Sequence, residues 1–584
     1  MQILMNHVGF EPKTKKTVIL QTKDQSCISG PIDVSVVDSR EKKKACSAQF
    51  CSSGCVDGWK GRFFHEFDFS ELRKPGVYVV IVKSGELTIE SQAFEVRDGL
   101  YANTCISDIL FYLKAQRSSG KWDQADRQAP FWGGRKDRVD VHGGWYDAAG
   151  DYGKYLSHLS YAEYFNPQQI PLVVWALTEL CETLLSRKVY KNVLLPERAL
   201  EEAYWGADFL VRMQDREGYF YSTVFDRWSK KTDERMICSF RTKKGDRFPF
   251  YQAGFRQGGG MAIAALARVS TIKALPETRG EYTSADYLRA AETGYNHLRL
   301  HNREYLNNRK ENIIDYYCGL LAAVELYNAT GKDTYLEDCR QWSSLLVSLF
   351  SPDIGWFFTE KGSRRPFCHA SDEGLPIAAL VKYCKAEPLE EKREQISQVI
   401  GEICAAKIEL SASVYNPFSL PRKWVQPVGG SSRQSFFIPH KNETGYWWQG
   451  ENAGLASLSS AFKMAADVIH DNEDKTSAAG LIEKVRKFSD SQINWILGMN
   501  PFDICMLQGR GRNNPEYEEF YPNAPGGICN GITAGFIDEN DIDFLPASVR
   551  GMGDHRWRWS EQWLPHAAWF LMAIIADQKD REYT

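Results

Sequence analysis

The sequence predicts two domains, a β-sandwich over residues 1–97 followed by a large all-helical domain over residues 98–584. Two observations lead to this prediction. Short runs of β-branched and aromatic residues, separated by polar turns, fill the first hundred residues. From residue 100 onward, apolar residues recur at every third or fourth position, which is the period of an amphipathic helix. A chain of 584 residues is long enough to bury both cores.

The first domain contains five predicted strands, at residues 18–20, 32–37, 63–69, 77–82 and 94–96. Polar turns such as Lys74-Pro75-Gly76 separate these runs, which is typical of a small β-sandwich. The domain shows no row of aromatic residues suited to a glycan. We therefore expect it to brace the helical domain.

Twelve segments of the second domain show the helical period, and we expect a helix in each. They are residues 101–117, 170–186, 197–213, 258–270, 283–299, 315–329, 333–349, 372–385, 390–409, 451–469, 479–497 and 563–577. Twelve helices can form an open array or a closed ring of helical hairpins. Periodicity alone does not distinguish these two arrangements.

Charge and hydropathy exclude several classes of partner. The 71 basic and 75 acidic residues nearly cancel and no basic run is present, so we expect no nucleic-acid partner. No apolar run is long enough to span a bilayer, so we expect no membrane partner. The first ten residues lack the pattern of a signal peptide, so we expect a cytoplasmic protein. The sequence does not indicate an oligomeric state.

The fourteen cysteines agree with a reducing compartment. Several lie inside apolar helical patterns, where a free thiol behaves as a small hydrophobic group. Cys46, Cys51 and Cys55 cluster in a polar stretch that we expect to be a loop. Their spacing is not Cys-x-x-Cys, and the nearest histidine is His65. We expect reduced cysteines there rather than a zinc site.

Residues 143–155 concentrate the side chains suited to catalysis. They read Gly-Gly-Trp-Tyr-Asp-Ala-Ala-Gly-Asp-Tyr-Gly-Lys-Tyr, with the carboxylates Asp147 and Asp151 four positions apart. A sugar ring offers apolar C–H faces to aromatic side chains and hydroxyl groups to carboxylates. A carboxylate in such a site can take a proton from water. A plain turn, in which aspartates cap backbone N–H groups, accounts poorly for the flanking aromatic residues.

This stretch resembles the Gly-Gly-Trp-Tyr-Asp-Ala-Gly-Asp-Tyr-Gly-Lys-Tyr segment of glycoside hydrolase family 9, with one alanine inserted. That family comprises inverting cellulases, often with an N-terminal immunoglobulin-like domain. The opening residues 3–12 are similar to the start of that domain. The resemblance implies an immunoglobulin-like β-sandwich followed by an all-α (α/α)6 barrel. It also implies that Asp151 is the general base and that Asp147 helps to hold the nucleophilic water.

The general acid must be a protonated carboxyl group, and Glu561 is our first candidate. It lies in a tryptophan-rich segment with Trp557, Trp559 and Trp563, and apolar surroundings raise the pKa of a carboxyl group. The segment is similar to the one that carries the family's acid before the last helix. A plainer interpretation is an acid in the first turn of a helix, stabilised by the helix dipole. The alternative candidate is Glu451, which also lies among tryptophans.

The expected substrate-binding residues are Tyr146, Trp448, Glu451, Arg510 and Trp559. Residues 494–515 begin like the family's Leu-Gly-x-Asn-Pro motif but do not continue with its Pro-His-His-Arg segment. Gln508, Arg510, Arg512 and Asn513 stand there instead, although each arginine can equally pair with an acid around a loop. We therefore expect a sugar-binding surface that differs from that of ordinary endoglucanases.

We expect no cofactor and no catalytic metal. Many family members bind a structural zinc through cysteines and a Cys-His pair, but the equivalent residues 117–120 and 129–131 contain no thiol or imidazole. The resemblance therefore implies that the zinc site is absent here. Calcium in helical loops is common in the family, and no ligand set for it maps onto this chain.

The predicted function is an inverting glycoside hydrolase that cleaves β-1,4 bonds of short, imported oligosaccharides. The chain is similar to the branch of exo-β-D-glucosaminidases, which act on chitosan-type oligosaccharides. In such a site Asp147 or Glu561 would hold the ammonium group of the sugar. The alternative is an endoglucanase or cellodextrinase that hydrolyses β-1,4-glucans.

Two interpretations from other classes remain open. The protein could bind glycans without turnover, with its acids serving only as hydrogen-bond acceptors. It could also be a metal-dependent helical-barrel enzyme that uses Asp147 and Asp151 as ligands. His142 is the only other candidate ligand close to that pair in the sequence.

Overall fold

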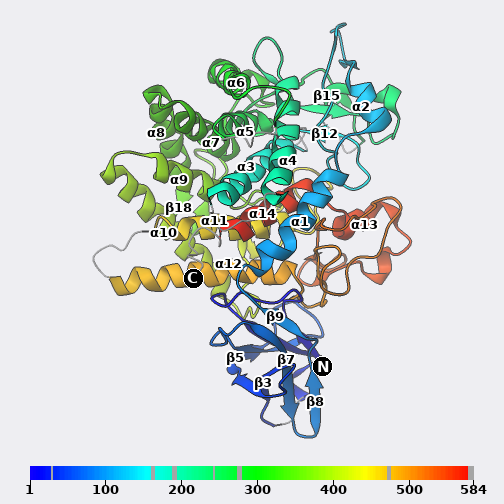
Figure 1. Cartoon of the computed structure of the whole chain (residues 1–584), viewed down its shortest axis with the longest axis vertical. Helices are drawn as coiled ribbons and strands as arrows, with labels where there is room; N and C mark the ends of the chain where they lie inside the picture. The colour runs from blue at the N-terminus through cyan, green and yellow to red at the C-terminus, as the bar shows by residue number, and fades with distance from the viewer. Residues whose placement is uncertain are drawn as a thin grey trace.

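The computed structural model describes residues 1–27, 30–158, 165–186, 194–240, 244–272, 279–469 and 475–576. A domain of β-sheets forms one end of the molecule, and a larger helical domain forms the rest (Figure 1). The predicted order, with the sheet domain first and the helical domain second, is confirmed.

Two antiparallel sheets make up the N-terminal domain, with strand orders β1–β2–β6–β5 and β4–β3–β7–β8, and β9 also pairs with β7. Their shared apolar core includes Phe10, Val36, Phe67, Tyr78 and Phe94. The elements are β1 (Gln2–Leu4), β2 (Thr17–Thr22), η1 (Gln25–Cys27), β3 (Asp33–Asp38), β4 (Lys44–Ser47), β5 (Gln49–Gly54), β6 (Phe63–Asp68), β7 (Gly76–Ser84), β8 (Leu87–Glu90) and β9 (Phe94–Val96).

The five predicted strands are confirmed as β2, β3, β6, β7 and β9. The apolar pattern does not predict β1, β4, β5 or β8, and the last three of these expose most of their side chains. A strand without a buried face carries no alternation of apolar and polar residues, so periodicity cannot find it. Cys46 and Cys51 accordingly lie on β4 and β5 rather than in the expected loop, and all fourteen cysteines are free thiols.

Six helices of the second domain are buried along most of their length. In chain order each of them contacts the next, and the last contacts the first, so that the contacts close a cycle. The six are α3 (Ile170–Ser186), α5 (Gly260–Val269), α7 (Ile313–Thr330), α9 (Leu375–Ala386), α11 (Asn452–Ala466) and α14 (Leu564–Ala576).

Six further helices pack against this cycle, each touching one or two of its members. They are α1 (Leu100–Ala115), α4 (Leu194–Arg212), α6 (Ser284–Tyr305), α8 (Asp333–Val347), α10 (Glu390–Ala412) and α12 (Lys475–Ile496). All twelve predicted helices correspond to these two sets. The sequence does not predict α2 (Gly120–Asp126) or α13 (Gly553–Ser560), because seven or eight residues are too few to show a helical period.

Short elements in the connections between helices complete the fold. One small sheet contains the end of the motif at residues 143–155, because β12 (Lys154–Tyr155) pairs with β14 (Thr223–Phe225), which is followed in the sheet by β15 (Met236–Phe240) and β16 (Arg247–Phe248). The short elements are β10 (Ala129–Pro130), β11 (Arg138–Val139), β12 (Lys154–Tyr155), β13 (Phe220–Tyr221), β14 (Thr223–Phe225), η2 (Thr232–Glu234), β15 (Met236–Phe240), β16 (Arg247–Phe248), β17 (Gln252–Ala253), η3 (Phe255–Gly259), β18 (Phe350–Ser351), β19 (Trp356–Phe357), β20 (Lys423–Val425), β21 (Arg433–Ser435), β22 (Thr533–Ala534), β23 (Ile542–Asp543) and η4 (Ala547–Val549).

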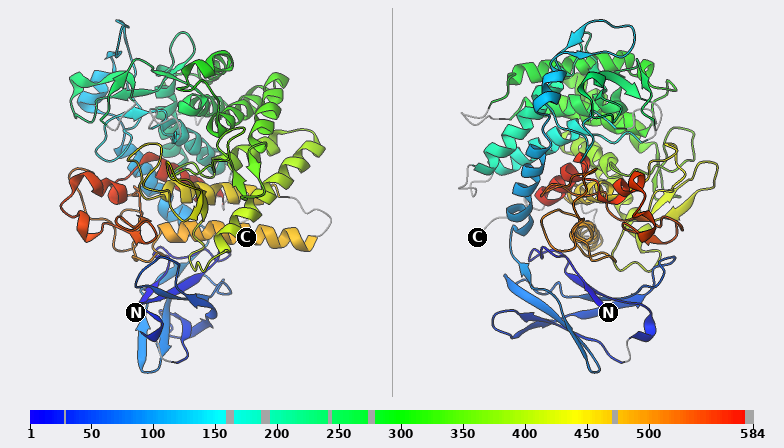
Figure 2. Two further views of the ribbon diagram at one scale, coloured as in Figure 1. Left: turned by 180° about the vertical axis from the view of Figure 1, so that it is seen from behind. Right: turned by 90° about the vertical axis from the view of Figure 1, so that its right-hand side faces the viewer.

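The end of the helical domain returns to its beginning. Helix α14, drawn in red, lies against α1 and α3 as well as against α11 (Figure 2). The closed cycle of contacts therefore brings the segment before α14 next to loops that precede α3. In the part of the chain that the structure describes, no helix is both long and apolar enough to cross a membrane.

The sheet domain is joined to the helical domain by a buried interface. Asn6 is fully buried, and its side-chain amide donates to the Asn494 side chain (2.8 Å) and to the Tyr101 hydroxyl (3.0 Å). Trp59 and Phe64 belong to the same apolar core as residues of the helical domain, and their rings contact Phe418. The sheet domain thus braces the helical domain.

The contacts of Asn6 predict that Asn6→Ala lowers the free energy of unfolding by about 1–3 kcal/mol, because it leaves buried partners without a hydrogen bond. Urea denaturation followed by tryptophan fluorescence measures this change. Lys43→Ala, on the exposed side of the same domain, is the control. Equal unfolding midpoints for the two variants would show that the Asn6 contacts contribute nothing to stability.

Candidate active site

Backbone hydrogen bonds join the motif at residues 143–155 to the segment before α14. Ala149 N–H donates to the Gln562 carbonyl (2.8 Å), and Leu564 N–H donates to the Asp147 carbonyl (3.2 Å). The indole N–H of Trp563 also donates to Asp147 Oδ1 (3.0 Å), although these two residues are 416 positions apart. This pairing brings Glu561 to the same pocket as the two aspartates.

A buried cluster of charged side chains holds the loop at residues 143–155 in place. The ammonium group of Lys154 contacts Asp126 (2.6 Å) and donates to the backbone carbonyls of Val141 and Gly143 (2.7 and 2.9 Å). Arg235 also pairs with Asp126 and donates to the Tyr152 carbonyl (2.5 Å). Two cations therefore fasten both ends of the loop that presents the aspartates.

Three donors surround the carboxylate of Asp151. Its Oδ1 accepts from the Gly153 N–H (2.7 Å), and its Oδ2 accepts from the Tyr155 hydroxyl and the Trp228 indole N–H (both 3.1 Å). These bonds favour the charged form. Burial and the negative charge of Asp226 outweigh them and raise the pKa of Asp151 to about 6. Asp151 is therefore largely a carboxylate at neutral pH, as a general base must be.

Asp147 and Glu561 lie in a less polar environment. Burial and the negative charge of Asp151 raise the pKa of each well above its usual value. Asn530 Nδ2 donates to Glu561 at 3.5 Å, a long bond that does little to favour the anion. Glu561 also caps the C-terminal end of α13, where the helix dipole disfavours a negative charge. It does not lie in the first turn of α14, so that plainer interpretation is wrong.

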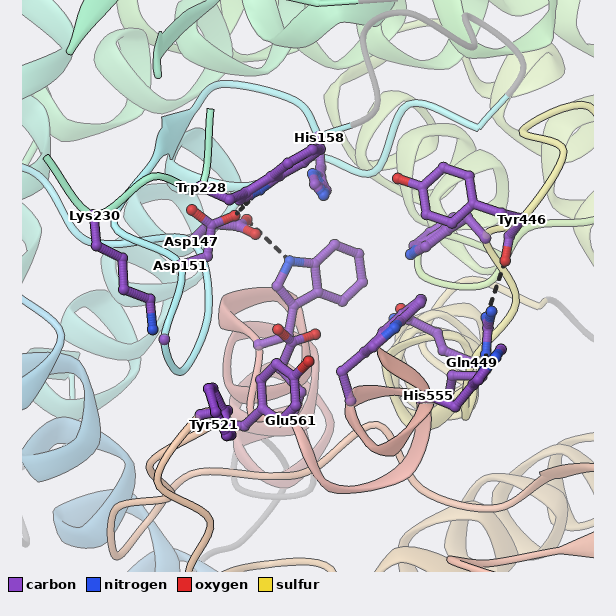
Figure 3. A pocket seen from close by; sticks show the side chains of 16 residues that line it. Asp147, Asp151, His158, Trp228, Lys230, Tyr446, Gln449, Tyr521, His555 and Glu561 are labelled. Carbon is purple, nitrogen blue, oxygen red and sulfur yellow. Dashed lines mark hydrogen bonds between the residues drawn. The ribbon is translucent and has the colours of Figure 1, made fainter. Parts of the chain in front are cut away.

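The three carboxyl groups line one pocket of about 630 Å³. Figure 3 shows Asp147 and Asp151 side by side, with Glu561 set apart from the pair. This volume suits a short oligosaccharide. The other lining residues combine aromatic rings with polar groups, as sugar binding requires: Gly150, His158, Trp228, Lys230, Tyr446, Trp447, Gln449, Phe520, Tyr521, His555, Trp557, Arg558 and Trp563.

The basic residues of the pocket differ in charge. Burial lowers the pKa of His158 to about 3, so its imidazole is neutral and can only exchange hydrogen bonds. Burial lowers the pKa of Arg558 to about 10, which leaves its guanidinium charged at neutral pH. Arg558 donates to the backbone carbonyls of Tyr446 and Trp448 and thereby fixes the wall opposite the aspartates.

Two of the predicted substrate-binding residues hold charges that are already paired elsewhere. The carboxylate of Glu451 is buried, pairs with Lys423 and accepts from the Ile438 N–H (2.6 Å). Arg510 pairs through two nitrogens with Asp108. Neither residue is among those that line this pocket, because each charge is paired at another place. Their roles in substrate binding, and that of Glu451 as the alternative acid, stay predictions.

The three predicted aromatic residues lie outside the lining of this pocket. The Tyr146 hydroxyl accepts from the Ser119 N–H (3.1 Å), and the Trp559 indole donates to Thr533 (2.9 Å). Trp448 stacks on His440 with ring centroids 3.7 Å apart. None of the three lines the pocket. Trp447, next to Trp448, and Trp557, two positions before Trp559 on α13, do line it, because residues one or two positions apart point in different directions.

Sequence reasoning also missed the donors to Asp151. Tyr155 stands in the motif and offered a signal, whereas nothing in the sequence around Trp228 marks it as a partner of Asp151. In the described ranges, no group of three His, Cys, Asp or Glu side chains is arranged to hold a metal ion. His142 bonds to Asp140 through Nδ1 (2.7 Å). The expectations about zinc and calcium stay predictions.

Comparisons with known proteins agree with this fold. The model of glycosyl hydrolase family 9 matches residues 101–519, and that of the cellulase N-terminal ig-like domain matches residues 1–86. The chain is thus an O-glycosyl hydrolase that carries an N-terminal immunoglobulin-like domain. It belongs to glycosyl hydrolase family 9.

The individual proteins that resemble this chain have a low sequence identity to it. A cellodextrinase from Butyrivibrio fibrisolvens is 27% identical over 251 residues, which are 38% of this chain and only 44% of that relative. Endoglucanase 22 from Oryza sativa subsp. japonica is 23% identical over 445 residues, covering 70% of this chain and 69% of the relative. The solved structure titled Bacteroides ovatus GH9 has a TM-score of 0.62 at 18% identity, covers 99% of this chain and 98% of its own, and shows the shared fold.

The site predicts that Asp151→Ala and Glu561→Gln each lower kcat by about 10²–10⁴-fold, because general acid–base catalysis contributes that much. Both variants should keep the circular dichroism spectrum of the parent. Glu519→Gln alters an exposed acid on the loop that borders the pocket and serves as the control. Full activity in either pocket variant would remove that residue from the mechanism.

The carboxyl environments also predict a bell-shaped pH profile of kcat/KM. Activity rises as Asp151 ionises, with a limb near pH 6, and falls when Glu561 loses its proton at higher pH. An aryl glycoside with a strongly acidic phenol needs no proton donor, so its alkaline limb should vanish. Persistence of that limb with such a substrate would mean that Glu561 is not the acid.

Proposed function

We propose that this protein hydrolyses short β-1,4-linked glucan oligosaccharides with inversion at the anomeric carbon. The observation that carries the proposal is the pocket in which a largely ionised Asp151 lies near a protonated Glu561. Two carboxyl groups whose environments push their pKa values apart are suited to serve as base and acid. The similarity to a cellodextrinase and to an endoglucanase supports the choice of a glucan.

The proposed reaction is a single displacement. Asp151 accepts a proton from a water molecule while the water oxygen attacks the anomeric carbon, and Asp147 helps to hold that water. The C–O bond to the leaving sugar breaks as Glu561 gives its proton to the glycosidic oxygen. The closed cycle formed by α3, α5, α7, α9, α11 and α14 supports the interpretation of the helical domain as an (α/α)6 barrel, with this pocket at one end. The fourteen free thiols support a cytoplasmic location.

A second candidate is hydrolysis of chitosan-type oligosaccharides, the exo-β-D-glucosaminidase activity. The pocket holds three carboxyl groups, whereas an inverting reaction needs two, so Asp147 is available to bind an ammonium group. Lys230 and Arg558 line the same pocket and repel a cationic sugar. This repulsion, together with the glucan-related names of the relatives, favours the neutral substrate.

A panel of cellobiose, cellotriose and the glucosamine dimer and trimer tests the proposal, with product anomers followed by NMR. We expect faster turnover of the cello-oligosaccharides and the α-anomer as the first product. Faster cleavage of the glucosamine dimer would establish the second candidate instead. An initial β-anomer would contradict inversion, and no turnover of any sugar or aryl glycoside would indicate a glycan-binding protein.

A further inference from the structure

The loop that carries Trp228 has an unusual backbone. Arg227, Trp228 and Lys230 have φ values of 61°, 57° and 59°, in the left-handed region that side-chain-bearing residues rarely adopt. The loop follows β14 directly and reaches the pocket through Trp228 and Lys230. Three such residues within four positions persist only where other contacts impose the conformation.

Asp226 supplies those contacts. Its side chain is completely buried and accepts hydrogen bonds from the backbone N–H groups of Trp228 (3.2 Å) and Lys230 (3.0 Å). The Ser229 hydroxyl donates to the Asp226 carbonyl (2.7 Å). One buried residue thus binds the loop at three successive positions.

Trp228 is held in one orientation by neighbouring rings. Its indole meets Phe225 and Phe240 edge-to-face, with centroids 5.0 and 5.8 Å apart. The backbone at Gly245 also packs against the Trp228 ring. The approach is so close that a Cβ atom at this position would lie only 3.0 Å from the ring. Phe225, Phe240 and Tyr155 form one small apolar cluster, separate from the main core, and Trp228 packs against it.

Both side-chain donors to Asp151 therefore come from this cluster. The Trp228 indole and the Tyr155 hydroxyl each donate to Asp151 Oδ2 at 3.1 Å, which occupies both lone pairs of that oxygen. Among the described residues, the Gly153 N–H is the one donor to Oδ1 (2.7 Å), which leaves one lone pair of that oxygen for another donor. Oδ1 is the oxygen left to receive a proton from water.

We propose that Asp226 is a positioning residue for Asp151: it holds the loop at residues 226–230 so that Trp228 Nε1 points at Asp151 Oδ2, which leaves Oδ1 to take the proton. This inference rests on the proposed role of Asp151 as general base. Asp226 itself touches neither substrate nor water in this account. It acts through Trp228 and through its charge.

The charges around Asp151 agree with this arrangement. Asp226 raises the pKa of Asp151, whereas the bonds from Trp228 and Tyr155 lower it. The other titratable groups that line the pocket with Asp151 are Asp147, Glu561, Lys230, Arg558, His555, Tyr446, Tyr521 and the neutral His158. Loss of a donor to Oδ2 and loss of the Asp226 charge therefore shift the pKa of Asp151 in opposite directions.

A double-mutant cycle of Asp226→Asn and Trp228→Phe tests the proposal, with kcat/KM measured across pH on the best substrate of the panel. Trp228→Phe should move the acid limb to higher pH by about one unit. Asp226→Asn should lower the plateau of kcat/KM about tenfold in the parent and less than twofold in the Trp228→Phe background, because one residue acts through the other. Asp233→Asn, an exposed acid of the same connection, is the control and should change neither quantity.

Additive effects on the plateau, or an acid limb that Trp228→Phe leaves in place, would overturn the proposal. If Asp226→Asn does not fold, Ser229→Ala removes a bond to the Asp226 carbonyl and replaces it in the cycle with the same expectation. The activity of Asp151→Ala is measured in the same experiment. If this variant is fully active, Asp151 is not the general base. If it is inactive and the effects in the cycle are additive, only the positioning role of Asp226 is refuted.

Discussion

The active site depends on a short backbone pairing between Asp147–Ala149 and Gln562–Leu564. These hydrogen bonds join segments that lie near opposite ends of the helical domain in sequence. They form because α14 packs against α3 and closes the cycle of buried helices. The proposed base and the proposed acid thus come from distant segments, and the closed arrangement brings them to one pocket.

Burial then gives the three carboxyl groups different roles. All three lose solvation, which favours their protonated forms. Asp151 recovers part of that loss through three hydrogen-bond donors, whereas Glu561 has one long bond and the end of a helix dipole that disfavours its anion. The fold therefore gives Asp151 the environment of a proton acceptor and Glu561 that of a proton donor. The loop at residues 143–155, which carries Asp147 and Asp151, is held in place by the ion pairs of Lys154 and Arg235 with the buried Asp126.

The resemblance of two segments, residues 143–155 and the tryptophan-rich segment before the last helix, indicated Asp147, Asp151 and Glu561 as candidates, and the structure brings these three residues to one pocket. Hydrophobic periodicity located the long helices and the strands with a buried face. It failed for β4, β5 and β8, whose side chains are mostly exposed. The ion pairs of Glu451 with Lys423 and of Arg510 with Asp108 could not be predicted either, because no local pattern reveals a partner distant in the sequence.

By itself, the sequence determined the order of the two domains, the long helices and the choice of candidate acidic residues, because these follow from local periodicity and from two short segments that each can be read locally. Only the tertiary structure decided that Trp447 and Trp557, rather than Trp448 and Trp559, line the pocket, and that Trp228 reaches Asp151. Adjacent side chains point to different sides of the backbone, and contacts between distant segments form only when the chain closes on itself. The direction of a side chain is therefore a property of the folded molecule.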